Sequence, residues 1–296
     1  MKIYSLGSLN IDYVYSVEHF VQAGETLSSE NMQTFPGGKG LNQSIALAKA
    51  GAEVIHGGIV GNGGQFLVST MEDAGVDVSK LKYVDSPSGH AIIQVNKDGQ
   101  NCILLFAGTN HALDAEYIND FLADAKENDI ILLQNETNAL GEVFEIAHKK
   151  KMQIAFNPSP YNEKIKELPL DYVSWWFCNE IEGECLFGSY APENIAQEFV
   201  KQYPHSNLIL TLGKNGALFI NSNEKHYQPI FETKTVDTTA AGDTFTGYFF
   251  ASLMSGEAPA NALKIASAAS ALAVSRKGAS PSIPTYKEVL SSEYLK

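Results

Sequence analysis

The chain has 296 residues, a net charge of −13 and 44% hydrophobic residues, enough apolar material for a large globular domain. Its acidic field would repel nucleic acid and anionic membranes, so neither is an expected partner. No stretch approaches about 18 continuous apolar residues, and no signal-peptide pattern opens the chain. The three cysteines have no CxxC spacing and the histidines no zinc-type spacing. We therefore expect a cytoplasmic protein, neither secreted nor membrane-spanning.

Strand-like and helical stretches alternate along most of the chain, beginning with a strand that ends at Gly7 and a helix over 43–49. The next expected strands are 53–60, 130–134, 153–156, 173–178 and 208–212, and the expected helices are 66–74, 115–125, 141–150, 192–203, one from Asp243 to Gly256, and 260–275. This alternation indicates a mostly parallel sheet with helices on both faces. We predict an α/β fold in a single domain spanning residues 1–296.

Two segments break the alternation, because each pairs two strands without a helix between them. Residues 13–17 are expected to pair with 26–35, and residues 90–96 with 101–106 through an Asp98-Gly99 turn. We expect these insertions, at about 10–36 and 88–108, to form a small sheet that projects from the main one. Such a sheet would cover a ligand cleft as a lid or pair with a second subunit.

Two glycine clusters resemble nucleotide-binding loops but fail on spacing. For the cluster around Lys39, a P-loop would need glycine where Gln33 stands and Ser or Thr where Gly40 stands. For the cluster after Gly61, a dinucleotide fingerprint would need glycine where Phe66 stands. Neither motif is therefore present.

A stronger signal is Asp243, which begins an amphipathic helix directly after Ala240, Ala241 and Gly242. Small residues let backbone N–H groups approach an anion closely, and the helix N-terminus adds partial positive charge. An N-cap role would explain the acid but not the small residues before it. An anion hole formed by those three residues beside a general base, Asp243, accounts for both.

The run from Asp237 to Gly247 resembles the C-terminal signature of the ribokinase (PfkB) family of carbohydrate kinases, and the resemblance covers nearly the whole chain. Four further motifs stand in the family's order, namely Gly7–Asp12, Phe35–Gln43, Asn179–Glu182 and Thr211–Gly216. The resemblance implies a ribokinase-like fold and an ATP-dependent transfer of phosphate to a primary hydroxyl, with O5 of D-ribose as the first candidate. It also implies a homodimer formed through the projecting strands.

The resemblance assigns three groups of residues. The sugar would be held by Asn10, Asp12, Gly38, Lys39, Asn42, Glu136 and Asp243. ATP and Mg²⁺ would be held by Asn179, Glu182, Thr211, Gly213, Gly216, Gly242 and Ser267. A K⁺ ion would be held by Asp237, Thr239, Ala273, Arg276, Gly278 and Ser282. From spacing alone, the second group also fits a capping box at Asn179 and the third a Schellman turn at Gly278.

Three positions depart from the family pattern. Asn62 stands where Asp is usual, Ile181 where a polar residue is common, and Tyr248 where a small residue is usual. Tyr248 would alter local packing or the adenine edge. Other acceptors within the family remain rivals: deoxyribose, fructose, or a nucleoside with Tyr13 or Phe106 as a base clamp. A catalytically silent sugar-binding regulator is the rival of another class, and it would be expected to lack Asp243.

Overall fold

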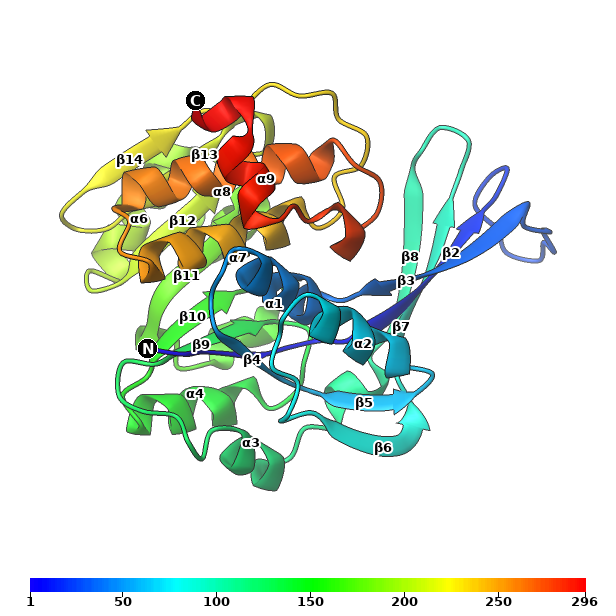
Figure 1. The fold of residues 1–296 in the computed structure, drawn as a ribbon, viewed down its shortest axis with the longest axis horizontal. Coiled ribbons are helices and arrows are strands. Elements are labelled where there is room, and N and C mark those ends of the chain that lie inside the picture. Colours follow the sequence, from blue (N-terminus) through cyan, green and yellow to red (C-terminus); the bar gives the residue numbers. More distant parts are fainter.

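The computed structural model describes residues 1–296 as an eight-stranded sheet covered by helices, with a four-stranded sheet projecting from it (Figure 1). The main sheet has the order β14-β13-β12-β11-β10-β9-β1-β4, parallel from β4 to β12 and antiparallel at β13 and β14. Its strands are β1 (Ile3–Leu6), β4 (Val54–Gly57), β9 (Ile130–Gln134), β10 (Gln153–Asn157), β11 (Val173–Asn179), β12 (Asn207–Thr211), β13 (Ala217–Ile220) and β14 (Lys225–Gln228). The predicted α/β fold class is confirmed.

Alternate residues of the buried strands face two separate cores, as the period of a strand requires. Ile3 and Leu132 pack in the first core, and Tyr4 and Leu133 pack in the second. The first core is covered by α1 (Lys39–Lys49), α2 (Gln65–Asp73), α7 (Ala241–Met254), α8 (Pro259–Val274) and α9 (Tyr286–Ser291), the second by α3 (Ala115–Phe121), α4 (Leu140–Lys149), α5 (Glu180–Phe187) and α6 (Pro192–Gln202). None of these helices has both the length and the apolarity to cross a membrane.

The projecting sheet has the order β3 (Asn31–Gly37), β2 (Asn10–Ser16), β7 (Gly89–Val95) and β8 (Asn101–Phe106). Both strand pairs predicted from the sequence are present and antiparallel, and β2 joins them by pairing with β7 in parallel. Because β2 follows β1 closely in the chain, the projecting sheet begins next to the carboxyl end of β1 (Figure 1).

Three predicted elements are wrong in detail. The strand expected over 53–60 is two strands, because the chain leaves the main sheet after Gly57 and continues as β5 (Ile59–Asn62), paired with the unexpected β6 (Lys82–Pro87). The helix expected over 115–125 ends at Phe121, and the following residues turn so that Leu122 and Ala125 are buried. The helix after Asp243 is not amphipathic, because every residue from Asp243 to Ser252 is buried between α1 and α8.

Candidate functional site

The candidate residues gather where parallel strands of the main sheet end. Ser8 follows β1 and Glu136 follows β9, whereas Asn179 and Thr211 end β11 and β12 at the same edge. The chain order reverses across β1, which lies between β4 and β9. Ligands of open α/β sheets bind outside the carboxyl ends of strands at such a reversal. The topology therefore places all four polar residues along one ligand-binding edge.

The start of α1 lies against the end of β1 because position 40 carries no side chain. A Cβ at Gly40 would lie 2.4 Å from the carbonyl carbon of Gly7, closer than any real contact. This approach lets the Gly40 amide donate to Ser8 Oγ at 3.3 Å and the Lys39 amide to Glu136 Oε2 at 3.0 Å. The Ser8 hydroxyl also donates to Glu136. The first turn of α1 is thus hydrogen-bonded to the carboxylate of Glu136, which follows β9.

Asp243 is 8% exposed and is held by two amides from α1. Asn42 Nδ2 donates to its Oδ2 at 3.1 Å, and Gln43 Nε2 donates to its Oδ1 at 2.9 Å. Gln134, the last residue of β9, in turn donates to Gln43 Oε1 at 2.8 Å. The carboxylate is therefore oriented by hydrogen bonds from other elements and caps no backbone N–H of its own helix.

A second amide pair lies where the projecting sheet begins. Asn110 Nδ2 donates to Asn10 Oδ1 at 2.7 Å, and Asn110 Oδ1 accepts from the Leu9 amide at 2.9 Å. Asp12 follows on β2, with its carboxyl group directly over Gly37 of β3. Gly38, the last predicted residue of this group, immediately precedes α1. The structure thus brings the predicted sugar-binding residues around one end of α1.

Three carboxylates belong to this group, Asp12, Glu136 and Asp243, here called the carboxylate cluster. Burial, and then the negative charge of Glu136, raises the pKa of Asp12 to about 7. Burial alone would lower the pKa of Lys39, but the carboxylates of Asp243, Glu136 and Glu182 outweigh it and leave that pKa raised. Lys39 is therefore a stable cation facing the cluster.

A cavity of about 530 Å³, here called the large cavity, lies on the other side of the start of α7. Seven predicted residues line it: Asn179, Thr211, Gly213, Gly216, Ala241, Gly242 and Ser267. Its other polar lining residues received no role from the sequence, although Lys214 and Thr238 lie within matched motifs. They are Lys214, Thr233, Thr235, Thr238 and Ser270. No carboxylate lines this cavity, although the chain carries 34 acidic residues.

The loop before α7 turns into the helix at Ala240, which has a φ of 59°. The Ala241 amide donates to Thr238 O at 3.2 Å, and the Thr244 amide donates to Ala240 O at 2.8 Å. The amides of Ala240, Gly242 and Asp243 have no partner in the chain, as expected before and within a first helical turn. Of the three residues predicted to form the anion hole, Ala240 and Gly242 thus have free N–H groups, while that of Ala241 is engaged within the loop. The N–H group of Asp243 is a further free donor.

Asn179 and Glu182 form the capping box that was the alternative interpretation of their spacing. Asn179 Oδ1 accepts from the Glu182 amide at 2.9 Å, and Glu182 Oε2 accepts from the Asn179 amide at 2.8 Å. The other carboxylate oxygen of Glu182 makes no hydrogen bond within the chain, although the residue is only 6% exposed. The box therefore fixes Glu182 and leaves one oxygen for a ligand or its water.

The predicted K⁺ residues are only partly connected. Asp237 Oδ1 accepts from the Thr239 amide at 2.9 Å and its hydroxyl at 2.6 Å, and Asp237 Oδ2 accepts from the Gly278 amide at 2.9 Å. The Ala273 carbonyl accepts from the Arg276 amide at 3.0 Å, whereas the Ser282 hydroxyl donates to Ala279 O at 2.7 Å. No cluster of three or more His, Cys, Asp or Glu side chains suited to a metal ion is present.

Two of the departures from the family pattern have a structural explanation. Asn62 Nδ2 donates to Asp85 Oδ1 at 3.0 Å, so a carboxylate from β6 stands beside the amide. Tyr248 does not line the large cavity, and its hydroxyl donates to Pro284 O at 2.7 Å. It therefore changes packing and not the cavity wall. Ile181 is exposed on α5, and nothing in the structure explains it.

Sequence reasoning missed four supporting residues. Ser8 and Gln43 contact the carboxylate cluster directly, Gln134 holds Gln43, and Asn110 holds Asn10. Gln134 ends the buried apolar strand β9 and Glu136 follows it closely, whereas the family resemblance pointed to the glutamate alone. Gln43 directly follows Asn42, so both amides reach the same carboxylate from one turn of α1. Asn110 had no local signal, because its partners are about 100 residues away.

Comparison with known proteins agrees with this geometry. The family model described as pfkB family carbohydrate kinase matches residues 1–286. A ribokinase of Haemophilus influenzae is 34% identical over 294 residues, covering 96% of each chain, and a deoxyribokinase of Salmonella typhi is 30% identical over 308 residues, covering 100% and 99%. The structure of Arabidopsis thaliana ribokinase complexed with ribose and ATP superposes with a TM-score of 0.89 at 29% identity, covering 100% of this chain and 98% of that one.

Proposed function

Because the chain belongs to the pfkB family of carbohydrate kinases, we propose that it is an ATP-dependent ribokinase acting on O5 of D-ribose. The observation that carries the proposal is the position of Asp243. Its side chain is held by Asn42 and Gln43 among the candidate sugar residues, while the preceding Gly242 lines the large cavity. A base placed there stands between a polyol and a polyphosphate. The ribokinases among the relatives support ribose as the acceptor.

The chemistry is an in-line phosphoryl transfer. Asp243 takes the proton of the sugar hydroxyl as that oxygen attacks the γ-phosphorus, and the bond from phosphorus to the bridging oxygen breaks to release ADP. The free N–H groups of Ala240, Gly242 and Asp243 stabilise the charge on the transferred group. Lys39, Asn10, Asp12, Asn42 and Glu136 hold the hydroxyls and orient O5.

Mg²⁺ bound with the nucleotide would neutralise charge on the phosphates. Glu182, held by the capping box with Asn179, would orient the hydrated ion through its unpaired oxygen. Thr211, Gly213, Gly216 and Ser267 would enclose the rest of the nucleotide. A catalytically silent regulator needs none of this arrangement, so the free anion-hole donors favour the enzyme.

The strand register favours a free sugar over a nucleoside. Tyr13 neighbours Asp12 on β2 and therefore faces the opposite side of the projecting sheet, and Phe106 lies on that opposite side with His90 and Ile11. The cross-strand neighbours on the face of Asp12 are Phe35, Ala91 and Leu105, which supply a single aromatic ring. One ring does not form a two-sided base clamp.

A coupled assay of ADP release over ribose, deoxyribose, fructose and adenosine tests the acceptor. We expect ribose to give the highest kcat/KM. Turnover of another acceptor without turnover of ribose would contradict ribokinase activity and leave the kinase proposal intact. Loss of turnover on every acceptor would contradict both.

We further propose that K⁺ binds near Asp237, Thr239, Ala273, Arg276, Gly278 and Ser282 and stiffens the anion-hole loop. Support comes from the Asp237 carboxylate, which already joins Thr239 to Gly278. Replacing K⁺ by Na⁺ at constant ionic strength in the same assay should lower kcat. An unchanged kcat would remove the cation from the mechanism.

We propose that the chain is one domain, with the projecting sheet as a lid inserted at about 10–36 and 88–108, and that two copies pair through β8. The support is the open edge of β8, whose six residues are all exposed, including Leu104 at 68%. Sedimentation should show a dimer that Leu104→Lys dissociates and Leu290→Lys, at an exposed leucine of α9, does not. A monomeric unmodified protein would contradict the dimer.

We also place the enzyme in the cytoplasm, where its cosubstrate ATP is made. The three unpaired cysteines, two of them exposed, suit a reducing compartment.

A further inference from the structure

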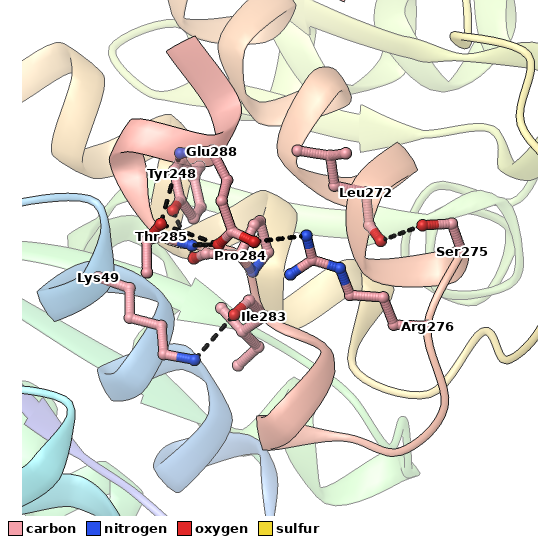
Figure 2. A network of polar contacts seen from close by, with 9 residues as sticks. All are labelled: Lys49, Tyr248, Leu272, Ser275, Arg276, Ile283, Pro284, Thr285 and Glu288. Atoms are coloured by element: carbon pink, nitrogen blue, oxygen red, sulfur yellow. Dashed lines mark hydrogen bonds and ion pairs between the residues drawn. The ribbon is translucent and has the colours of Figure 1, made fainter. Parts of the chain in front are cut away.

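The segment from Ser275 to Thr285, here called the strap, joins α8 to α9 and is held by side chains from other elements (Figure 2). Lys49 Nζ reaches it from α1 and donates to Ile283 O at 2.8 Å. The Tyr248 hydroxyl reaches it from α7 and donates to Pro284 O at 2.7 Å. At the start of the strap, the Arg276 guanidinium donates to Glu288 Oε1 at 2.7 Å and so links the strap to α9.

The two helices that hold the strap are also the helices that build the candidate site. Tyr248 shares α7 with Asp243, and Lys49 shares α1 with Asn42. The helices meet closely at Gly247, where a Cβ would lie 2.4 Å from the Cβ of Ala46. Since close-packed helices move as a unit, the strap is anchored to the same rigid pair that carries the base.

The strap is also tied to the loop that precedes α7. Its Gly278 amide donates to Asp237 Oδ2, and the other oxygen of that carboxylate accepts both donors of Thr239. Thr239 directly precedes Ala240, where the chain turns into the helix and leaves N–H groups unpaired. Asp237 thus links the strap to the anion-hole loop through hydrogen bonds.

We propose that Tyr248 is a positioning residue for phosphoryl transfer, acting through the strap and Asp237 on the loop that presents the anion-hole N–H groups. Tyr248 is 0% exposed and does not line the large cavity, so it acts without touching the nucleotide. Lys49 assists it at the neighbouring carbonyl. The inference rests on the proposed kinase function and extends it to a residue outside the site.

The test is Tyr248→Phe, which removes one hydroxyl and keeps the ring. Tyr117→Phe is the matched control, because the Tyr117 hydroxyl is also buried and bonds Gly58 and Lys80 in the other core. Tyr248→Phe should lose about 2–4 °C in Tm, the usual effect of one buried hydrogen bond. Tyr117→Phe should lose at least as much, because its hydroxyl bonds two residues. Only Tyr248→Phe should lower kcat, by about tenfold, with KM for ribose and ATP within about twofold, because misplaced donors weaken transition-state contacts.

Hydrogen exchange provides a readout that needs no substrate. The hydrogen-bonded amides of the anion-hole loop and of the strap should exchange at least about tenfold faster in Tyr248→Phe than in the unmodified protein or the control. They are the amides of Asp237, Thr239, Ala241, Thr244 and Gly278. Unchanged exchange, or a kcat that falls no further than in Tyr117→Phe, would overturn the inference. If no acceptor is turned over at all, the proposed function fails, whereas the exchange rates still decide whether Tyr248 holds the loop.

Discussion

The carboxylate cluster and the large cavity lie on either side of the start of α7 and are built by different means. In the cluster, charged side chains are fixed by other side chains, as Asn42 and Gln43 fix Asp243. The cavity is lined by hydroxyls, small residues, larger apolar side chains, one amide and one lysine, without a carboxylate. A neutral polyol can be held by acids, whereas a polyphosphate is better received by backbone N–H groups and a helix N-terminus. An acidic chain can therefore bind an anion by keeping its acids to one side of the site.

The largest expected effect comes from the residue where the two regions meet. Asp243→Asn keeps the shape of the side chain and its place beside Asn42 but cannot accept a proton. We expect kcat to fall by about 10²–10⁴-fold, with a circular dichroism spectrum that matches the unmodified protein. A variant with near-normal kcat would show that the proton leaves by another route.

The cavity should tolerate loss of a hydroxyl and resist added bulk. Ser267→Ala removes one oxygen from a wall of small residues and should change KM for ATP by less than about threefold. Ser267→Phe fills the space instead and should raise that KM at least about tenfold, leaving KM for ribose unaltered. If Ser267→Ala proved as harmful as the phenylalanine, the cavity would depend on side-chain hydrogen bonds as the cluster does, and the contrast would be lost.

The cluster should also have a stability cost that depends on pH. The pKa of Asp12 is about 7 in the folded protein and 3.8 ordinarily, so the folded chain holds a proton that the unfolded chain has released. The protonated Asp12 therefore contributes to the free energy of unfolding. This contribution is fully present below about pH 4 and is lost as pH rises through about 7. Asp12→Asn cannot ionise, so its Tm advantage over the unmodified protein should grow by about 3–6 °C between about pH 5 and about pH 8.

The control for that measurement is Asp85→Asn, which removes an exposed carboxylate. Its Tm difference from the unmodified protein should stay constant over the same range. A constant difference for Asp12→Asn as well would mean that the cluster accommodates three charges without cost.

The alternation of strands and helices was enough to predict the main sheet, because each element carries its own periodicity. Position 134 ends both the predicted and the observed strand, for example. The division at Gly57 was not predictable, because β5 leaves the sheet to pair with β6, a partner that no local pattern indicates. The burial of α7 on all sides could not be predicted for the same reason, because the helices that cover it, α1 and α8, come from other parts of the chain.

Residues that line the large cavity were predictable where small residues or a motif marked them, as at Gly242 and Asn179. The supporting amides were not, because Asn110 and Gln134 act through partners about 90 to 100 residues away. The capping box at Asn179 shows a further limit of sequence spacing. The same Asn-x-x-Glu pattern satisfies a helix start and leaves an oxygen for a ligand, so both interpretations of the spacing are compatible.

The open edge of β8 also bears on the handling of this protein. An exposed apolar strand with unpaired backbone groups is a template for any other extended chain. If a second copy covers it, dilution below the dissociation constant of the dimer uncovers it again. Association of the uncovered edges is then opposed by repulsion between molecules that each carry a net charge of −13. Salt screens this repulsion. Aggregation should accordingly be favoured by high salt and suppressed by a lysine at position 104.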